Sequence, residues 1–143
     1  MTIVMNLDEQ YLIETNEQVL KRHQQKTGQQ VWIEAIPKNI ARVFPMINSV
    51  GNSGNKKEDL IEKAACIMAV IPWTQAFFGN RRTAIIATGK FLHDNGYELD
   101  IDPEDENLEL RNMLSEIKKQ SQTLNQSVMK QMYFYISKRI RPL

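Results

Sequence analysis

The sequence predicts an all-α fold with one small β element, built as a single domain from residues 1–143. Apolar residues recur at three- and four-residue spacing in several segments, which is the pattern of helices that bury one face. Residues typical of helix starts and ends separate these segments. One stretch, residues 29–36, alternates between two sets of side chains as a half-buried strand does, and Pro37 ends it.

Two helices are expected in the N-terminal third. The first runs from Leu7 until it fades between Gln24 and Gly28, with Asp8 as its N-cap. Its apolar face consists of Tyr11, Leu12, Thr15, Val19 and Leu20. The second covers residues 38–49, where we expect Pro45 to kink or shorten the helix. Its inward side chains are Ile40, Val43, Phe44 and Ile47.

The most apolar helix is expected from Lys57 to Val70, ended by Pro72. Its apolar residues cover more than one face, so it belongs near the centre of the core. A glycine- and asparagine-rich loop at residues 50–55 precedes it. The apolar run from Ala64 to Trp73 is too short to span a bilayer. Cys66 lies inside this run and is expected to be an inert core residue.

The C-terminal part predicts a short extended segment and two more helices. The extended segment is Tyr97–Ile101. The next helix opens with an acidic turn, in which Pro103 takes the first helical position. Its apolar residues are Leu108, Leu110, Met113, Leu114 and Ile117. The last helix runs from Leu124 to about Arg139, and its consecutive rings Tyr133, Phe134 and Tyr135 span more than one face, so we expect one to be exposed.

The remaining helix starts in an unusual way. Asn80 is a good N-cap, and Asn95-Gly96 supplies a left-handed stop. Arg81 and Arg82 occupy the first turn, where the helix dipole disfavours cations. A bound anion would relieve this repulsion, because backbone N–H groups and both guanidinium groups could converge on one phosphate. The alternative is that Asn80 is only a cap and that the arginines pair with acids such as Glu104 or Asp105.

This helix resembles the signature helix of the Fic/Doc (Fido) family, especially its short Doc-type branch. The family signature reads His-x-Phe-x-Asp/Glu-Gly/Ala-Asn-Lys/Gly-Arg, and Thr-Ala follows it in Doc-like members. Gly79, Asn80 and Arg82 match its second half, and Thr83-Ala84 match the extension. The first half differs: Thr74 stands at the histidine position, Ala76 at the phenylalanine position and Phe78 at the acid position.

The resemblance implies a Fido-like helical bundle with a small β flap that holds a target peptide. The flap falls around Gln29–Pro37, with Val31, Trp32 and Ile33 as its central residues. A single strand that packs Trp32 into a groove is the alternative. The phosphate-binding residues that the resemblance implies are Gly79, Asn80, Arg81 and Arg82, and the ligand class is ATP or another nucleoside triphosphate.

The catalytic half of the signature is broken. In the family, the histidine is the general base and the acid holds magnesium. Thr74 has no basic site near neutral pH, and Phe78 offers no oxygen to a hard cation, so neither a catalytic residue nor a metal site is expected. His23 is early in the chain and His93 lies far along the helix, so we expect neither to replace the base.

Three functions follow as hypotheses. The first is a Doc/Fic-like protein that has lost AMP or phosphate transfer and binds a partner protein or a phosphate-bearing ligand. The second is an active Doc-like toxin that transfers AMP or phosphate from a nucleoside triphosphate to a protein hydroxyl in the translation machinery. The third is an unrelated helical adaptor. The resemblance implies a protein partner, either antitoxin-like or a target.

Composition limits the classes of partner and the cellular compartment that we expect. A net charge of +1 gives no reason to expect a nucleic acid or a membrane as partner. One cysteine and no signal peptide favour the cytoplasm. Trp73, Phe77 and Phe78 form an aromatic group expected in a loop, either as plugs of the former active-site cleft or as an exposed adhesive surface.

Overall fold

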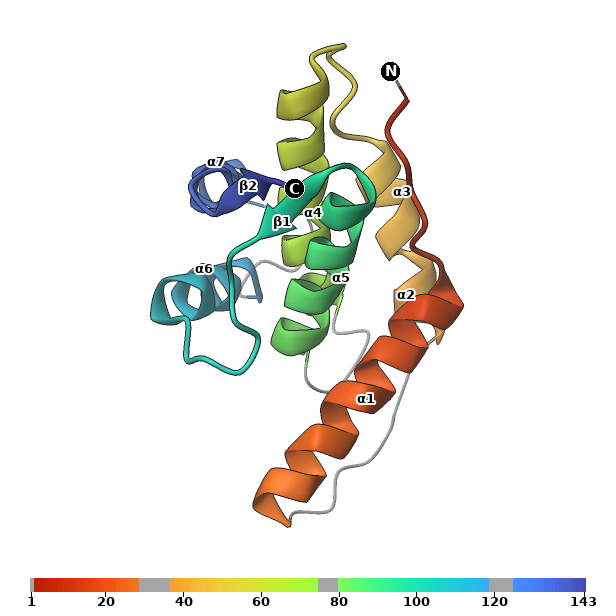
Figure 1. Ribbon diagram of the computed structural model, residues 1–143, viewed down its shortest axis with the longest axis vertical. Helices are drawn as coiled ribbons and strands as arrows, with labels where there is room; N and C mark the ends of the chain where they lie inside the picture. The colour runs from red at the N-terminus through yellow and green to blue at the C-terminus, as the bar shows by residue number, and fades with distance from the viewer. Residues whose placement is uncertain (1, 29–36, 75–79, 119–124) are drawn as a thin grey trace.

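The structure, a computed structural model, describes residues 2–28, 37–74, 80–118 and 125–143. It confirms the predicted fold class, because the described chain is mostly helical with a small two-stranded antiparallel sheet (Figure 1). In chain order the elements are α1 (Glu9–Thr27), α2 (Pro37–Ala41), α3 (Val43–Asn48), α4 (Lys56–Thr74), α5 (Asn80–Asp94), β1 (Tyr97–Leu99), α6 (Leu108–Lys118), α7 (Gln126–Ser137) and β2 (Ile140–Pro142).

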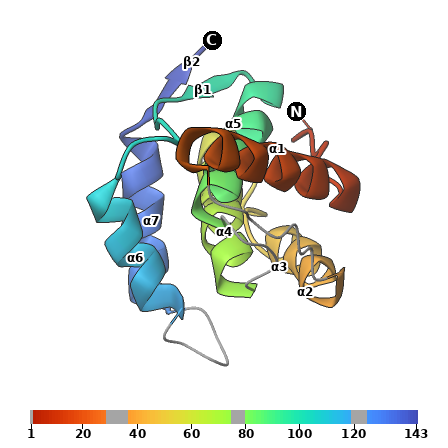
Figure 2. The same ribbon diagram turned by 90° about the horizontal axis from the view of Figure 1, so that it is seen from below.

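Helix α4 occupies the centre of the bundle. It lies antiparallel beside α5, with α6 and α7 on one side and α2 and α3 on the other (Figure 2). From Asp59 to Thr74 nearly every side chain is buried. A helix that is apolar around its whole circumference needs neighbours on every side, and the surrounding helices supply them.

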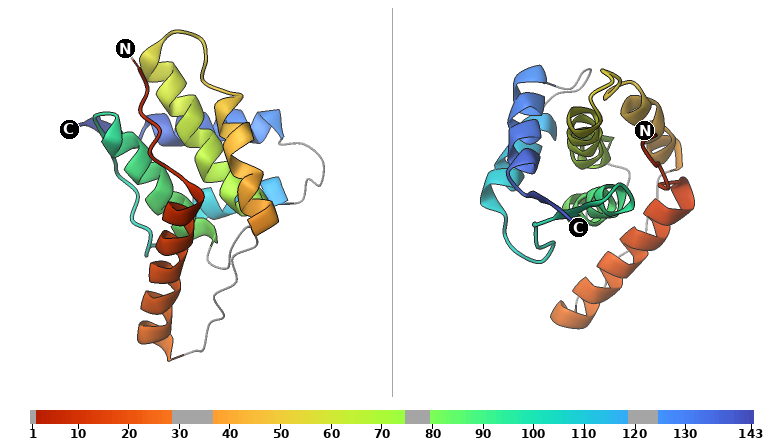
Figure 3. Two further views of the ribbon diagram at one scale, coloured as in Figure 1. Left: turned by 90° about the vertical axis from the view of Figure 1, so that its right-hand side faces the viewer. Right: turned by 45° about the horizontal axis from the view of Figure 1, so that its top comes forward.

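Helix α1 begins and ends as the sequence predicts. The Asp8 carboxylate accepts a hydrogen bond from the Tyr11 backbone N–H at 2.7 Å, so Asp8 is the N-cap. Gly28 ends the helix in a left-handed conformation with φ of 69°. The C-terminal half of α1 projects beyond the bundle, as two views at right angles show (Figures 1 and 3).

The predicted helix at residues 38–49 is two short helices, and the break lies upstream of the proline. Arg42 separates α2 from α3. Pro45 sits in the first turn of α3, where a backbone N–H would have no partner within the helix. The proline ring would clash with the carbonyl of Ala41 in a continuous helix, and this explains a break at Arg42.

Two predicted helix boundaries are wrong, because contacts in the folded chain outweigh the helix-start and helix-stop signals of single prolines. Pro72 does not end α4, which continues to Thr74. The missing Pro72 N–H removes one backbone hydrogen bond, and burial of the side chains around it offsets this cost. Pro103 is not helical either, since α6 begins at Leu108. The Asp102 carboxylate accepts a hydrogen bond from the Glu104 N–H at 2.9 Å and closes a turn there instead.

The loop at residues 49–55 is fastened to α4 by buried charges. The Asp59 carboxylate accepts hydrogen bonds from the Ser53 hydroxyl at 2.6 Å and from the Ser53 and Gly54 backbone N–H groups. The Lys63 ammonium donates to the Val50 carbonyl at 2.7 Å. Gly51 is required here, because its φ is 69° and a Cβ would lie 2.6 Å from the Asp59 carbonyl oxygen.

The small sheet joins two segments that are distant in sequence. In the antiparallel pair, Glu98 of β1 is opposite Arg141 of β2. The extended segment at 97–101 is therefore confirmed in part, whereas the sequence analysis missed β2 and extended the last helix to Arg139 instead of Ser137. The predicted strand and flap at residues 29–36 lie outside the described residues.

Residues just after α5 form hydrogen bonds with segments near both ends of the chain. Gly96, at φ of 92°, is the predicted left-handed stop. The Asn95 side chain accepts from the Val4 N–H at 2.7 Å and donates to the Val4 carbonyl at 2.8 Å. The Leu143 N–H donates to the Gly96 carbonyl at 3.0 Å.

Replacing Phe91 tests the core around α4 and α5. The Phe91 side chain is fully buried, so Phe91→Ala should lower the free energy of unfolding by about 3–5 kcal/mol. The Phe134 side chain is 59% exposed, so Phe134→Ala should change it by less than about 0.5 kcal/mol. Urea unfolding of both variants checks this, and equal losses would contradict the burial described here.

The Asp59 contacts predict a pH-dependent contribution to stability. The hydrogen bond from the Ser53 hydroxyl, with those from the Ser53 and Gly54 backbone, lowers the pKa of Asp59 in the folded protein. This contribution is present above the unfolded aspartate pKa of about 3.9 and is lost as the pH falls through the lower folded pKa. The stability difference between wild type and Asp59→Asn should therefore shrink on acidification below pH of about 4. Asp100→Asn, at an exposed ion pair, is the control.

Candidate functional site

The first turn of α5 lies between the C-terminal half of α1 and the turn at residues 102–107. Asn80, expected as the cap, is the first residue of α5. A buried polar contact fixes α5 against α1: the Asn16 amide donates to the Thr83 hydroxyl at 3.1 Å. Leaving either group unpaired in the core would be costly, so this pair sets how the two helices align.

Arg81 holds the turn at residues 102–107. One of its nitrogens, Nη1, donates to the backbone carbonyls of Asp105 at 2.8 Å and Glu106 at 2.9 Å. Burial lowers the pKa of Arg81, and the nearby charges of Arg111 and Arg82 lower it further. A guanidinium carries five N–H donors, so this contact leaves donors for a second partner.

Arg82 contacts His23, so this histidine lies beside the start of α5 although it comes early in the chain. Arg82 Nη1 lies 3.4 Å from His23 Nδ1. An arginine nitrogen can only donate, so a hydrogen bond between these two groups has Nδ1 as the acceptor. His93, in contrast, is exposed in the last turn of α5 and lies far from this site, as expected.

Glu104 is the carboxylate of the site. It forms an ion pair with Lys26 of α1 at 2.9 Å. The hydrogen bond from Lys26 lowers the pKa of Glu104, and the charges of Arg82, Lys26 and Arg22 add to this effect. We refer to Arg22, His23, Lys26, Arg82 and Glu104 as the first-turn cluster. A pocket of about 310 Å³ adjoins it, with Arg22 and Glu104 in its wall.

The Thr74 hydroxyl is buried and hydrogen-bonded within α4, so it is not free to act at the first-turn cluster. Its side chain is 4% exposed at the end of α4, and Oγ1 donates to the Ile71 carbonyl at 3.1 Å. Trp73 also belongs to α4 and not to a loop. The Arg42 guanidinium lies over its ring, 5.2 Å from the ring centroid. The other predicted site residues, Gly79, Phe77, Phe78 and the flap residues Val31, Trp32 and Ile33, lie outside the described residues.

Comparisons with protein-family models, curated proteins and solved structures gave no match. Among the residues that the structure describes, no group of three His, Cys, Asp or Glu side chains is placed to hold a metal ion. In that same part of the chain, no helix combines the length and the apolar character needed to cross a bilayer.

The first-turn cluster can attract an anion. Three of its members, Arg22, Lys26 and Arg82, are cations, and Glu104 is its one carboxylate. They lie beside the first turn of a helix, where backbone N–H groups and the helix dipole favour negative charge. The sequence analysis identified Arg82 and named Glu104 as an acid with which the arginines could pair, but it missed Arg22, His23 and Lys26. Basic residues near the end of α1 could have signalled them, although this pattern is also typical of a solvated helix end.

Arg81→Ala should loosen the turn at residues 102–107. Two charge-assisted hydrogen bonds would be lost, at a cost of about 1–2 kcal/mol because water can replace them at these exposed carbonyls. Faster amide hydrogen exchange across that turn would report the change. Arg111→Ala is the control, because it removes a nearby positive charge and leaves both Arg81 hydrogen bonds in place. Amide exchange in the turn should therefore stay unchanged in this variant. The same exchange rates in both variants would contradict the assignment.

Proposed function

We propose that this chain is a Doc/Fic-like protein that has lost AMP or phosphate transfer and that acts by binding. Its ligand is a phosphate-bearing molecule, with ATP or another nucleoside triphosphate as the first class to test, and its partner is a protein of antitoxin-like or target type. The observation that carries the proposal is the excess of cations beside the first turn of α5.

The charge arrangement supports the phosphate site. Arg82 is partly buried and its neighbours Arg22 and Lys26 project from α1, so three cations approach one helix start. Arginine binds phosphate oxygens with paired N–H donors, which is the stronger kind of charge-assisted contact. Glu104 neutralises part of this charge in the free protein. We expect a phosphate to compete with Glu104 for Lys26, so binding should be weak.

The side chains near this site also support the loss of transfer. A general base typically contributes about 10²–10⁴ in rate, so a replacement would have to be well placed. Thr74 is buried and bonded to its own helix.

The Gly79-Asn80-Arg81-Arg82-Thr83-Ala84 segment favours the Fido family over an unrelated adaptor. The active-toxin alternative requires a base and a magnesium ligand, and the motif residues Thr74 and Phe78 supply neither. His23 and Glu104 lie near Arg82, and the transfer assay below tests whether they take these roles. We infer the cytoplasm as the compartment, because a chain with one cysteine cannot form an internal disulfide. Burial raises the pKa of the Cys66 thiol to about 12, which keeps the thiol unreactive.

Calorimetric titration with ATP tests the phosphate site. Wild type should bind with a dissociation constant on the order of 0.1–1 mM, and more weakly as salt is added. Arg82→Ala should weaken binding at least about tenfold, because it removes a phosphate contact. Arg141→Ala, at an exposed ion pair of β2, should bind as wild type does. No heat signal in the wild type would overturn the proposal.

A separate assay tests the loss of transfer. Labelled ATP, magnesium and a cell lysate should yield no labelled protein with wild type. Transfer of label that Arg82→Ala abolishes would show an active enzyme and contradict the binding-only function.

A further inference from the structure

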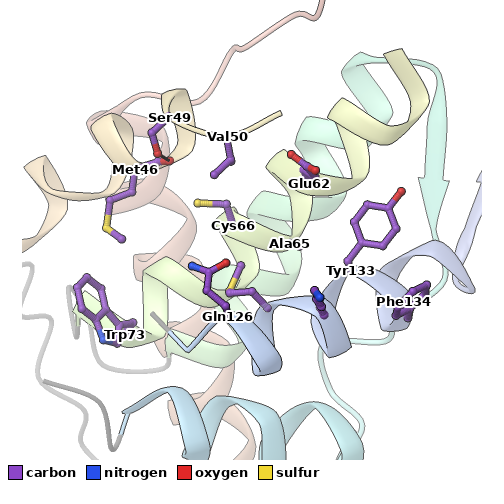
Figure 4. A pocket seen from close by; sticks show the side chains of 12 residues that line it. Met46, Ser49, Val50, Glu62, Ala65, Cys66, Trp73, Gln126, Tyr133 and Phe134 are labelled. Carbon is purple, nitrogen blue, oxygen red and sulfur yellow. Dashed lines mark hydrogen bonds between the residues drawn. The ribbon is translucent and has the colours of Figure 1, made fainter. Parts of the chain in front are cut away.

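A second pocket lies away from the first-turn cluster, between α3, α4 and α7 (Figure 4). Its volume is about 790 Å³. We call it the apolar groove and define it by Met46, Cys66, Trp73, Met129, Tyr133 and Phe134. It is walled on one side by α4 and on the other by α7, and the loop fastened by Asp59 and Lys63 closes its α3 side.

The side chains of the groove are of the kind that bind proteins. Methionine and aromatic residues are enriched in interface cores, and methionine adapts its shape to a partner. Phe134 is 59% exposed at the edge, against the tendency of large apolar side chains to be buried. Its ring meets that of Tyr133 edge to face, with centroids 5.6 Å apart, so the edge is held in place.

Charge is distributed unevenly along the groove. Glu62 lines the groove at the end where Tyr133 lies (Figure 4). The charge of Glu58, one turn earlier on α4, also acts on Tyr133. Among the described residues no ion pair neutralises Glu58. At the other end the Arg42 guanidinium lies 5.2 Å from the centre of the Trp73 ring. Lys130 lines the groove between these two ends, one turn of α7 before Phe134. The groove is therefore negative at its Glu58 end and positive at its Arg42 end.

We infer that the apolar groove binds an amphipathic helix of a partner protein, with its N-terminus at the Glu58 end. An apolar stripe would fill the space between α4 and α7, as in other helix-in-groove complexes. Basic residues in the first turn would pair with Glu58 and Glu62. The helix dipole adds to this orientation, because its positive end meets the carboxylates and its negative end meets Arg42. The inference rests on the proposed binding function, since it specifies the class of protein partner.

A displayed library of helical peptides of about 18 residues, or five turns, tests the inference against the whole folded chain. Selected peptides should share apolar residues at i, i+3 or i+4, and i+7, and should carry Lys or Arg near the N-terminus. Phe134→Glu should weaken their binding at least about tenfold, by placing a charge against the apolar stripe. Leu108→Glu is the matched control, because Leu108 is an equally exposed apolar residue of α6, at 62%. It should change binding less than about twofold.

Charge reversal tests the orientation. Glu58→Lys should weaken the same peptides and favour versions with Glu in the first turn. Selection without a helical pattern, or equal effects of Phe134→Glu and Leu108→Glu, would overturn the inference. So would a dimer in sedimentation that Phe134→Glu dissociates, because a second copy would then cover the groove, or tight binding of a small apolar dye with no peptide selected. Arg82→Ala disables the phosphate site and should leave peptide binding unchanged. Failure of the phosphate site and failure of the groove can therefore be told apart.

Discussion

Burial of α4 on all sides is the constraint from which the arrangement follows. Its side chains from Asp59 to Thr74 are almost wholly removed from water, so α3, α5, α6 and α7 must all pack against it. A helix hairpin of α4 and α5 then places the start of α5 at one end of the bundle. The same packing leaves the apolar groove along α4, where α3 and α7 do not meet. Both proposed binding surfaces are thus consequences of how one central helix is covered.

Sequence patterns predicted the helices well where the signals were local and consistent. The Asp8 cap, the Gly96 stop and the exposed ring among residues 133–135 are confirmed because each depends on neighbouring residues alone. Boundaries were wrong where distant contacts decide: burial carries α4 past Pro72, and the β1–β2 pairing ends the last helix early. A β-strand that pairs across the sequence leaves almost no local signal.

The candidate site could be predicted only in part, because contacts between segments that are distant in the sequence assemble it. Arg82 was identified because it breaks the charge preference of a helix start. His23 and Lys26 were not, since their place beside the start of α5 depends on how α1 packs against α5 and the turn at residues 102–107. In the assembled cluster, Glu104 neutralises part of the positive charge of Arg22, Lys26 and Arg82, and the Arg82 guanidinium contacts the His23 imidazole.

The central claim is that the first turn of α5 binds phosphate and that the apolar groove does not. Backbone amide chemical shifts, followed by NMR while magnesium-free ATP is added, test it residue by residue. The account predicts shifts that saturate and that are confined to the start of α5, the C-terminal half of α1 and the turn at residues 102–107. Shifts centred instead on α3 and α7, or none at all at millimolar ATP, would contradict it.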